Sequence, residues 1–401
     1  MIRESGMPQG QLSGVRVVDL TRILSGPFCT QLLADLGAEV IKIETPPTGD
    51  PIRGQGGIKD GLSWYFAGFN RNKRSVSLNL RTPEGKAILR RLIATADVLV
   101  ENFRPTVLDQ MGFGFEELKV IKPDIVVCSI SGYGKTGPYR DRPSFDFIAQ
   151  AMSGFMSTTG YADGEPLRAG LPVSDLVAGL YAALAVSSAL WRRDRTGQPE
   201  QIDVSLTDAL LSFASYFGST YLATGVSLPR NGNDHPVVAP YGLFAATDGD
   251  VAIAPSNDQI YERLVDALGI EEVRQDPDFS TNELRVRNRA RINAIVGAKI
   301  RQRSRDSWIE TLNRAGVPCG RVLTFAEAFC DPQVLAREMV VEVDHPGHGP
   351  VQMIGFPMKF REAACALRSP APALGSDTEA VLTALDYDEV EIQALREQGI
   401  I

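Results

Sequence analysis

Short apolar runs alternate with amphipathic stretches through the first third of the chain. The apolar runs predict strands at residues 15–20, 39–44, 75–80, 97–102 and 124–131. The stretches between them predict helices at 27–36 and 83–96. Strands that alternate with helices form βαβ units, whose strands are parallel. Because the runs are continuous rather than alternating, the sheet is expected to be covered on both faces. The predicted fold class is α/β.

The rest of the chain predicts a helical region followed by a mixed one. Residues 143–222 look mostly helical, and two charge-free runs, 176–191 and 209–229, are interpreted as buried helices. Turn residues gather at 227–236, which indicates a domain boundary. Beyond this boundary we expect a hairpin at 241–254, turning at 248–250, and helices at 259–268, 285–303 and 388–398.

One segment between predicted strands is unusually long. Residues 45–70 are rich in Gly and Pro and include Trp64 and Tyr65. Loops of this length within a compact domain are usually functional or act as lids. We therefore expect this segment to border a site.

Length and charge narrow the class of protein. The chain has 401 residues, enough for roughly two to three domains, and its 44% hydrophobic and 22% charged residues are typical of a globular protein. The 41 basic and 49 acidic residues give a net charge of −8. An acidic surface repels phosphate backbones, so nucleic acid is not an expected partner.

Cysteines and histidines argue against a disulfide framework and a metal site. The 5 cysteines are scattered and odd in number, which fits a reduced cytoplasmic protein. Neither they nor the 3 histidines show CxxC or HExxH spacing, so we expect no metal.

Residues 1–13 are polar and lack the apolar core of a signal peptide, and neither charge-free run is convincing as a membrane span. The protein is expected in the cytoplasm, without a membrane partner.

The first βα turn is the first candidate for ligand binding. It reads Thr-Arg-Ile-Leu-Ser-Gly-Pro at 21–27, without a GxGxxG or GxxxxGK[ST] motif. A helix that starts here would still offer unpaired N–H groups to an anion, although Gly26-Pro27 is equally compatible with a simple helix-start turn. Arg22, Arg104 and the segment after Cys128 should meet at the carboxyl edge of the sheet, where a ligand with several phosphates is plausible.

Further basic residues follow the long loop. Arg71, Lys73 and Arg74 lie beside the third predicted strand. They could face the same ligand, but each fits a solvated basic rim better.

Asp175 is the most informative single residue. It stands at the head of a long apolar helix. The simple interpretation is an N-cap, which contributes about 1 kcal/mol to helix stability. The functional interpretation is an ionised, partly desolvated carboxylate that attacks an acyl group. Ser174 beside it lacks the GxSxG context of a serine hydrolase.

These segments together resemble the class III CoA-transferase family, which includes formyl-CoA transferase and L-carnitine CoA-transferase. The resemblance runs from about residue 12 to the C-terminus. The matching segments are 12–44 (LSGVRVVDLTRILSGPFCTQLLADLGAEVIKIE), 70–86, 96–113, 166–184 (PLRAGLPVSDLVAGLYAAL), 315–322 and 331–339.

The resemblance implies a mechanism and a set of contacts with coenzyme A. Asp175 matches the aspartate that attacks an acyl-CoA thioester, giving a mixed anhydride and then an aspartyl-CoA thioester, which an incoming carboxylate resolves. The positions that match contacts with coenzyme A are Leu24, Ser25, Thr45, Leu78, Asn79, Arg81, Asn102, Phe103, Arg104, Phe145 and Asp146.

The resemblance also implies an architecture. Two chains would thread through each other as an interlocked homodimer. Each would have a Rossmann-like large domain at 1–225, a smaller inserted α+β domain at 226–330, and a C-terminal part at 331–401 that returns to the large domain.

Departures from the formyl-CoA branch bear on the substrate. That branch carries Gln at the position of Leu24 and Arg at that of Thr45, and a glycine run where this chain reads Gly-Asn-Asp-His-Pro at 232–236. These differences argue against formate and oxalate. Basic and polar residues near Arg168, His235 and Tyr241 favour dicarboxylic acids, with succinyl-CoA as donor. His235 could instead be a loop residue bonded to Asn233 or to the backbone.

Two other functions remain open. An α-methylacyl-CoA racemase would pair the same aspartate with an upstream histidine, but the matching position here is Phe145, which cannot carry a proton. A non-catalytic acyl-CoA-binding dimer is the other alternative, which an absence of turnover in the parent chain would favour, whereas full turnover of an Asp175→Asn protein would reject Asp175 as the nucleophile.

Overall fold

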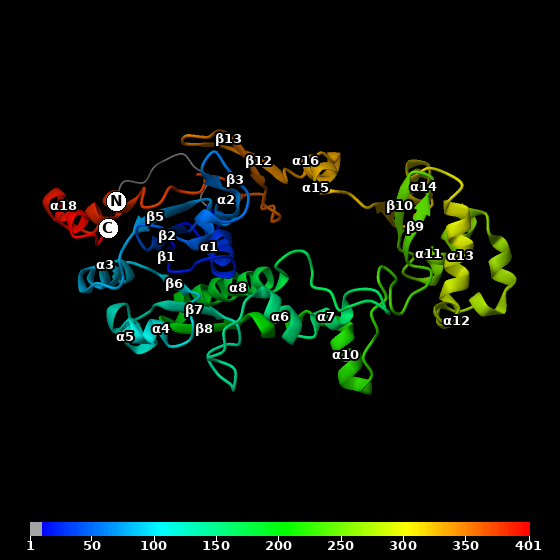
Figure 1. Cartoon of the computed structure of the whole chain (residues 1–401), viewed down its shortest axis with the longest axis horizontal. Coiled ribbons are helices and arrows are strands. Elements are labelled where there is room, and N and C mark those ends of the chain that lie inside the picture. Colours follow the sequence, from blue (N-terminus) through cyan, green and yellow to red (C-terminus); the bar gives the residue numbers. More distant parts are fainter. Residues whose placement is uncertain (1–9) are drawn as a thin grey trace. The chain divides into compact units, whose positions relative to one another are not determined.

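The computed structural model describes residues 10–401, so residues 1–9 of the polar N-terminal segment lie outside the described residues. The chain forms two compact units (Figure 1). The first contains residues 10–153, Gly170–Phe213 and Pro332–Ile401, and the second contains Gly154–Ala169 and Ala214–Asp331. The boundaries expected from the sequence, after residues 225 and 330, stay a prediction about separately folding domains.

A six-stranded sheet organises the first unit, and all of its neighbouring strands are parallel. In spatial order the strands are β5 (Lys73–Ser77), β2 (Glu39–Glu44), β1 (Arg16–Asp19), β6 (Val98–Glu101), β7 (Val126–Ser131) and β8 (Glu200–Ser205). The order reverses between β1 and β6, and such switch points are where open α/β sheets bind ligands. The α/β prediction is confirmed.

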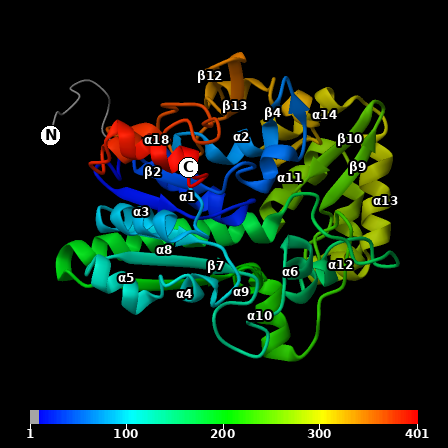
Figure 2. The ribbon, with the colours of Figure 1, turned by 60° about the vertical axis from the view of Figure 1, so that its left-hand side comes forward.

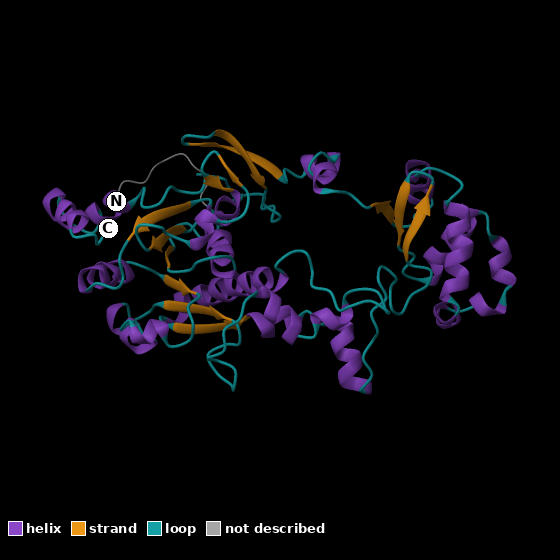
Figure 3. Cartoon of the chain, in the orientation of Figure 1, coloured by secondary structure: helices purple, strands orange, loops and turns teal. Residues whose placement is uncertain are grey.

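Helices cover both faces of this sheet (Figure 3). Neighbouring residues of a strand enter different cores, because side chains alternate between faces: Val17 belongs to one hydrophobic cluster and Val18 to the other. One face packs against α1 (Ser25–Asp35), α6 (Asp146–Met152), α8 (Val173–Thr196) and α9 (Leu206–Ser212). The other packs against α3 (Pro83–Ala94), α5 (Phe115–Ile121), α17 (Thr378–Thr383) and α18 (Glu389–Glu397).

The C-terminal segment completes the edge of the sheet beside β5. The Asp377 amide donates to the Ser75 carbonyl oxygen at 2.9 Å, and the Asp377 carboxylate accepts from the Ser75 amide at 3.0 Å. Figure 2 shows this red segment against the first unit. The remaining elements of the first unit are α4 (Val107–Gln110), α16 (Pro332–Ala336), β12 (Val340–His345) and β13 (Gly349–Ile354).

The long segment at 45–70 is more ordered than a loop. It contains η1 (Pro51–Gly54), β3 (Ile58–Lys59), β4 (Leu62–Ser63) and α2 (Trp64–Asn70). Ile52 and Phe66 are buried together with Ala371 in a small cluster of their own. Residues 45–70 are therefore a packed part of the fold rather than a free loop.

The second unit has a separate core around an antiparallel sheet. Its strands are β9 (Gly242–Ala246), β10 (Gly249–Ile253) and β11 (Cys319–Arg321), and the hairpin β9–β10 agrees with the sequence. Its helices are α7 (Phe155–Thr158), α10 (Ser215–Thr224), α11 (Asp258–Leu268), η2 (Glu271–Gln275), η3 (Pro277–Phe279), α12 (Asn282–Arg287), α13 (Arg289–Ile300), α14 (Arg305–Arg314) and α15 (Phe325–Ala328).

Residues 143–222 are mostly helical, as expected, but they also include β8, whose Ile202 and Val204 pack against the sheet core. One expectation about the charge-free runs is wrong. The run 209–229 is not a buried helix, because α10 buries none of its residues within the chain. Helix α8 is long and apolar enough to cross a bilayer by composition, but half of its most apolar window is buried inside the protein. Burial on one face explains that apolar stretch.

Candidate active site

A cavity of about 310 Å³ lies at the switch point of the sheet in the first unit. Its walls come from the segments that follow β1, β6 and β7 and from the start of α8. The residues that carry the argument are Arg22, Leu24, Ser25, Asn102, Arg104 and Asp175. The expectation that Arg22, Arg104 and the segment after Cys128 meet at this edge is confirmed, and Arg140 and Arg142 also line the cavity.

Two hydrogen bonds join the loops on either side of the switch point. The Arg22 amide donates to Asn102 Oδ1 at 2.9 Å, and Asn102 Nδ2 donates to the Arg22 carbonyl oxygen at 2.8 Å. The side chain of Asn102 therefore fixes the path of the loop after β1. Its predicted role as a contact to coenzyme A stays a prediction.

Asp175 lines the cavity but does not cap α8. The N-cap is Pro172, and Asp175 is the third helical residue, so the interpretation of Asp175 as an N-cap is wrong. Asp146 performs that task instead: its Oδ1 accepts from the Ser174 amide at 3.0 Å and from the Ser174 hydroxyl at 2.9 Å. Since another carboxylate satisfies the helix end, Asp175 is left to face the cavity.

A glycine brings the start of α1 against the head of α8. A Cβ atom on Gly179 would lie 2.6 Å from the carbonyl oxygen of Ser25 and 3.0 Å from the Phe28 ring. Without that atom the two helices approach closely, and the Ser25 side chain hydrogen-bonds to Asp175. Helix α1 itself has no side-chain cap, so its first amides remain available to a ligand.

The surroundings of Asp175 favour its neutral form. Burial and the nearby charge of Asp146 raise the pKa of Asp175 to about 7, while the hydrogen bond from Ser25 opposes this rise. Among the described residues no ion pair reaches Asp175. A carboxyl group with such a pKa, in a cavity, is a candidate reactive group.

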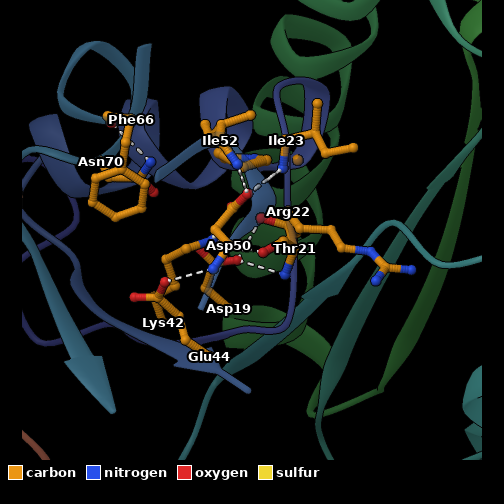
Figure 4. A network of polar contacts seen from close by, with 12 residues as sticks. Asp19, Thr21, Arg22, Ile23, Lys42, Glu44, Asp50, Ile52, Phe66 and Asn70 are labelled. Atoms are coloured by element: carbon orange, nitrogen blue, oxygen red, sulfur yellow. Dashed lines mark hydrogen bonds and ion pairs between the residues drawn. The ribbon is translucent and has the colours of Figure 1, made fainter. Parts of the chain in front are cut away.

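A fully buried network of charges lies behind the loop (Figure 4). Lys42 Nζ lies 3.0 Å from the Asp50 carboxylate, and Lys73 Nζ lies 3.2 Å from that of Asp19. Asp19 also accepts from the amide of Thr21 at 2.8 Å. These pairs contact the backbone of the loop at Thr21, through Asp19 and Lys42, and at Ile23, through Asp50.

The prediction of a solvated basic rim at Arg71, Lys73 and Arg74 is therefore wrong for the first two residues. Lys73 is fully buried against Asp19, and Arg71 is buried against Asp35 at 2.7 Å. Arg74 is half-buried between Glu39 and Asp377. All three lie outside the cavity lining, so they do not serve the expected phosphate ligand there.

The predicted contacts to coenzyme A divide into two groups. Leu24, Ser25, Asn102, Phe103, Arg104 and Phe145 line the cavity, and Asp146 lies next to Asp175. Thr45, Leu78, Asn79 and Arg81 do not line it: Leu78 is fully buried in the core, while Thr45 and Arg81 are exposed after β2 and β5. Roles for these four residues stay predictions, and the Leu78 side chain is packed away from any ligand.

The predicted substrate residues lie in the second unit. The ring centroids of His235 and Tyr241 are 5.0 Å apart, and Tyr216 stacks on His235 at 5.8 Å. His235 Nδ1 accepts from the Val237 amide at 3.3 Å, as a loop histidine bonded to the backbone would. Burial and then the charge of Arg289 lower the pKa of His235, which favours the neutral ring.

Tyr65 lies outside the cavity lining but near enough to Asp175 for their charges to interact. Burial and then the charge of Asp175 raise the pKa of Tyr65. The sequence pointed to this residue only through its place beside Trp64 in the long Gly- and Pro-rich segment. Between residues 10 and 401 no group of three or more His, Cys, Asp or Glu could hold a metal ion.

Comparison with known proteins decides the family. The model of CoA-transferase family III matches residues 12–378. The chain belongs to CoA-transferase family III. Among its relatives, succinyl-CoA:glutarate CoA-transferase of Mus musculus is 37% identical over 99% of this chain and 93% of that protein. Acetyl-CoA:oxalate CoA-transferase of Acetobacter aceti is 41% identical over 88% of this chain and 90% of that protein.

A solved structure has the same fold over nearly the whole chain. A CAIB/BAIF family protein from Brucella suis is 41% identical, has a TM-score of 0.84, and matches 95% of this chain and 100% of its own. The expected resemblance and the enzyme class of this CoA-transferase family III member are thus confirmed. The switch-point cavity is the place where its chemistry can be sought.

Proposed function

We propose that the protein transfers coenzyme A from an acyl-CoA donor to a free carboxylic acid, with Asp175 as the nucleophile. One observation carries the proposal: Asp175 is the carboxylate without a cationic partner that lines a switch-point cavity rich in arginine. A cation would hold the carboxylate in an ion pair and weaken it as a nucleophile.

The reaction proceeds through two anhydrides and one thioester. The Asp175 carboxylate attacks the acyl carbon, a C–O bond forms, the C–S bond breaks, and CoA leaves as a thiolate. The thiolate attacks the Asp175 carbonyl and releases the donor acid, which leaves an aspartyl-CoA thioester. The acceptor carboxylate repeats both steps in reverse order. No net proton is consumed, and Asp175 returns to its starting form.

The cavity has the chemistry that coenzyme A requires. Arg22, Arg104, Arg140 and Arg142 would hold its phosphates, because guanidinium groups bind phosphate through paired hydrogen bonds. Leu24, Ser25, Phe103 and Phe145 would border the pantetheine end beside Asp175. No metal is part of the proposed chemistry.

For the substrates, we propose a dicarboxylic pair with succinyl-CoA as donor. The name of the mouse relative, a succinyl-CoA:glutarate CoA-transferase, supports this choice. The name of the Acetobacter aceti relative includes oxalate, so oxalate belongs in any test even though Leu24 and Thr45 depart from the formyl-CoA branch. Arg168, His235 and Tyr241 of the second unit are proposed to bind the distal carboxylate.

The working form is proposed to be an interlocked homodimer in the cytoplasm. Leu180, Leu184 and Trp191 of α8 are exposed large apolar side chains that a second copy would cover. All five cysteines are unpaired, which fits a reducing compartment. Light scattering of the purified protein tests the dimer, and a single-chain mass would reject it.

A panel of acyl-CoA donors against free acids, read by mass spectrometry, tests the activity. We expect new acyl-CoA masses with succinyl-CoA and dicarboxylic acceptors, and none with the Asp175→Asn enzyme. Exclusive use of monocarboxylates would reject the dicarboxylate proposal. Exchange of an α-proton of a 2-methylacyl-CoA without transfer would support the racemase, although Phe145 stands where that chemistry needs a base. Acyl-CoA binding without any turnover would support the non-catalytic dimer.

A further inference from the structure

The loop between β1 and α1 contains a residue in an unfavourable backbone conformation. Ile23 has a φ of 70°, in the left-handed region. For a β-branched residue this conformation is strained, because the side chain crowds its own backbone. Ile23 lines the cavity, and the next two residues, Leu24 and Ser25, carry the wall to Asp175. Something outside the loop must hold it in place.

Asp50 makes the contacts that hold Ile23. The Ile23 amide donates to the Asp50 carboxylate, at 3.1 Å to Oδ1 and 3.2 Å to Oδ2. Asp50 in turn lies 3.0 Å from Lys42, and both side chains are almost completely buried. Figure 4 shows Asp50 directed at the Ile23 amide from behind the loop.

Neighbouring residues are fixed by other groups. Lys42 Nζ donates to the Thr21 carbonyl oxygen at 2.7 Å, and Asn102 bonds to both backbone groups of Arg22. Among the described side chains, Asp50 is therefore the one that binds the backbone of the strained residue itself. Because Lys42 contacts both the Thr21 carbonyl oxygen and the Asp50 carboxylate, it links the contact at Thr21 to the contact at Ile23.

We propose that Asp50 is a positioning residue for the transfer reaction. It holds Ile23 in the left-handed conformation, and this conformation directs Ser25 to the Asp175 carboxylate. Asp50 does not line the cavity and touches no reacting atom. The kinetic part of this proposal rests on the proposed function; the structural part does not.

The competing explanation is that Asp50 only stabilises the fold as half of a buried ion pair. Asp35 offers a matched control, because it is equally buried, pairs with Arg71 at 2.7 Å, and has no contact with residues 21–25. Substitution of either aspartate by asparagine removes one buried charge from an ion pair. Only the Asp50 substitution should alter the loop.

The experiment is a double-mutant cycle between positions 50 and 23. Asp50→Asn is made with Ile23 and with Ile23→Gly, and Asp35→Asn is the control. We measure kcat and KM for CoA transfer, and hydrogen exchange of the peptide that contains residues 20–26. With Ile23, Asp50→Asn should lower kcat about tenfold and speed exchange of that peptide. With Ile23→Gly, which removes the strain, the loss should be below about threefold. Equal losses in both backgrounds, or the same loss from Asp35→Asn, would overturn the proposal.

A second pair of variants applies even if Asp50→Asn does not fold. Ile23→Gly and Ile23→Ala remove the same contacts, but only glycine tolerates a positive φ. We expect Ile23→Gly to melt several degrees above Ile23→Ala and its residues 20–26 to exchange hydrogen more slowly. The reverse order of melting temperatures and exchange rates would show that residue 23 is not held in the left-handed conformation. If the parent enzyme showed no transfer with any substrate, the proposed function would fail, while the exchange and melting data would still decide the role of Asp50.

Discussion

Buried carboxylates occupy two neighbouring regions of the first unit under opposite conditions. Behind the loop after β1, Asp19 and Asp50 are almost fully buried, and each faces a lysine within 3.2 Å. At the head of α8, Asp175 is half-buried beside a second carboxylate, Asp146. The hydroxyl of Ser25 is the group that lowers its pKa by hydrogen bonding.

The difference lies in the groups that surround the same side chain. A buried carboxylate paired with a cation can hold backbone groups in place, and loss of one partner leaves a buried charge unpaired. A carboxylate that lacks a cation has a raised pKa and is available to a substrate. The pairing therefore fits Asp19 and Asp50 to a structural role, and the lack of a cation fits Asp175 to the nucleophilic role that we propose.

Asp175→Asn should change the activity more than any other substitution. We expect transfer activity to fall by at least about 10³-fold, because the amide cannot form the anhydride. The stability of the Asp175→Asn variant should instead rise at high pH. The raised pKa of Asp175 means that the native state binds more protons than the unfolded state above about pH 4, so its contribution to stability is lost as the pH rises through about 7. The variant should therefore melt above the parent at pH 8.

Asp208 provides a matched control for this variant. It is also the third residue of its helix, α9, but it is exposed and lies outside the cavity lining. Asp208→Asn should leave turnover within about twofold of the parent. Full turnover of Asp175→Asn would show that the comparison between the two regions is mistaken.

The second effect concerns the paired region. Lys73→Met leaves Asp19 without its cation, so we expect the free energy of unfolding to fall by about 3–5 kcal/mol in urea titrations. The exposed pair of Arg314 and Glu310 supplies the contrast, since Arg314→Met should cost less than about 1 kcal/mol. Similar losses from both substitutions would mean that the buried pair is not needed for the fold.

Gly179→Ala tests the close approach of α1 and α8. A methyl group would meet the Ser25 backbone, so we expect about 1–3 kcal/mol of destabilisation and weaker activity as Ser25 moves from Asp175. Gly68 in α2 has open space around its Cβ position, so Gly68→Ala should be neutral or slightly stabilising. Thermal melts and kcat/KM of the two variants give the answer; an undisturbed Gly179→Ala enzyme would contradict the packing argument.

The smallest effects are opposite shifts of the pH profile. Because the nucleophile must be ionised, kcat/KM should fall below about pH 7 in the parent. Asp146→Asn removes a charge that raises the pKa of Asp175, so the acidic limb should move to lower pH. Ser25→Ala removes the opposing hydrogen bond, so the limb should move to higher pH. Shifts in the same direction would show that another group controls the profile.

Much of the first unit could be predicted from local pattern. Residues 39–44 form β2 as expected, and Pro83 opens α3 behind the cap Thr82. Strand β8 was missed because its sequence, EQIDVS, has only two apolar residues and follows a long helical run. The run 209–229 differs from the expectation because apolar composition alone does not say whether a helix is buried, and α10 buries none of its residues within the chain.

For the site, the sequence indicates the proposed nucleophile but not the residues that surround and support it. Asp175 was recognisable from its place at the start of an apolar helix. Lys73 was not, because a lysine between arginines looks solvated, and its burial depends on Asp19, which is 54 positions away in the sequence. That Asp146, and not Asp175, satisfies the start of α8 also depends on a contact across 28 positions. Such long-range pairing has no local signal.

Covalent trapping shows most directly whether Asp175 is the nucleophile. The enzyme is incubated with succinyl-CoA, treated with hydroxylamine, digested and examined by mass spectrometry, since hydroxylamine converts an aspartyl anhydride or thioester into a hydroxamate. We predict a hydroxamate at Asp175 only when acyl-CoA is present, with loss of activity in proportion. A hydroxamate on another residue, or unmodified Asp175 in an enzyme that turns over fully, would show that Asp175 is not the nucleophile.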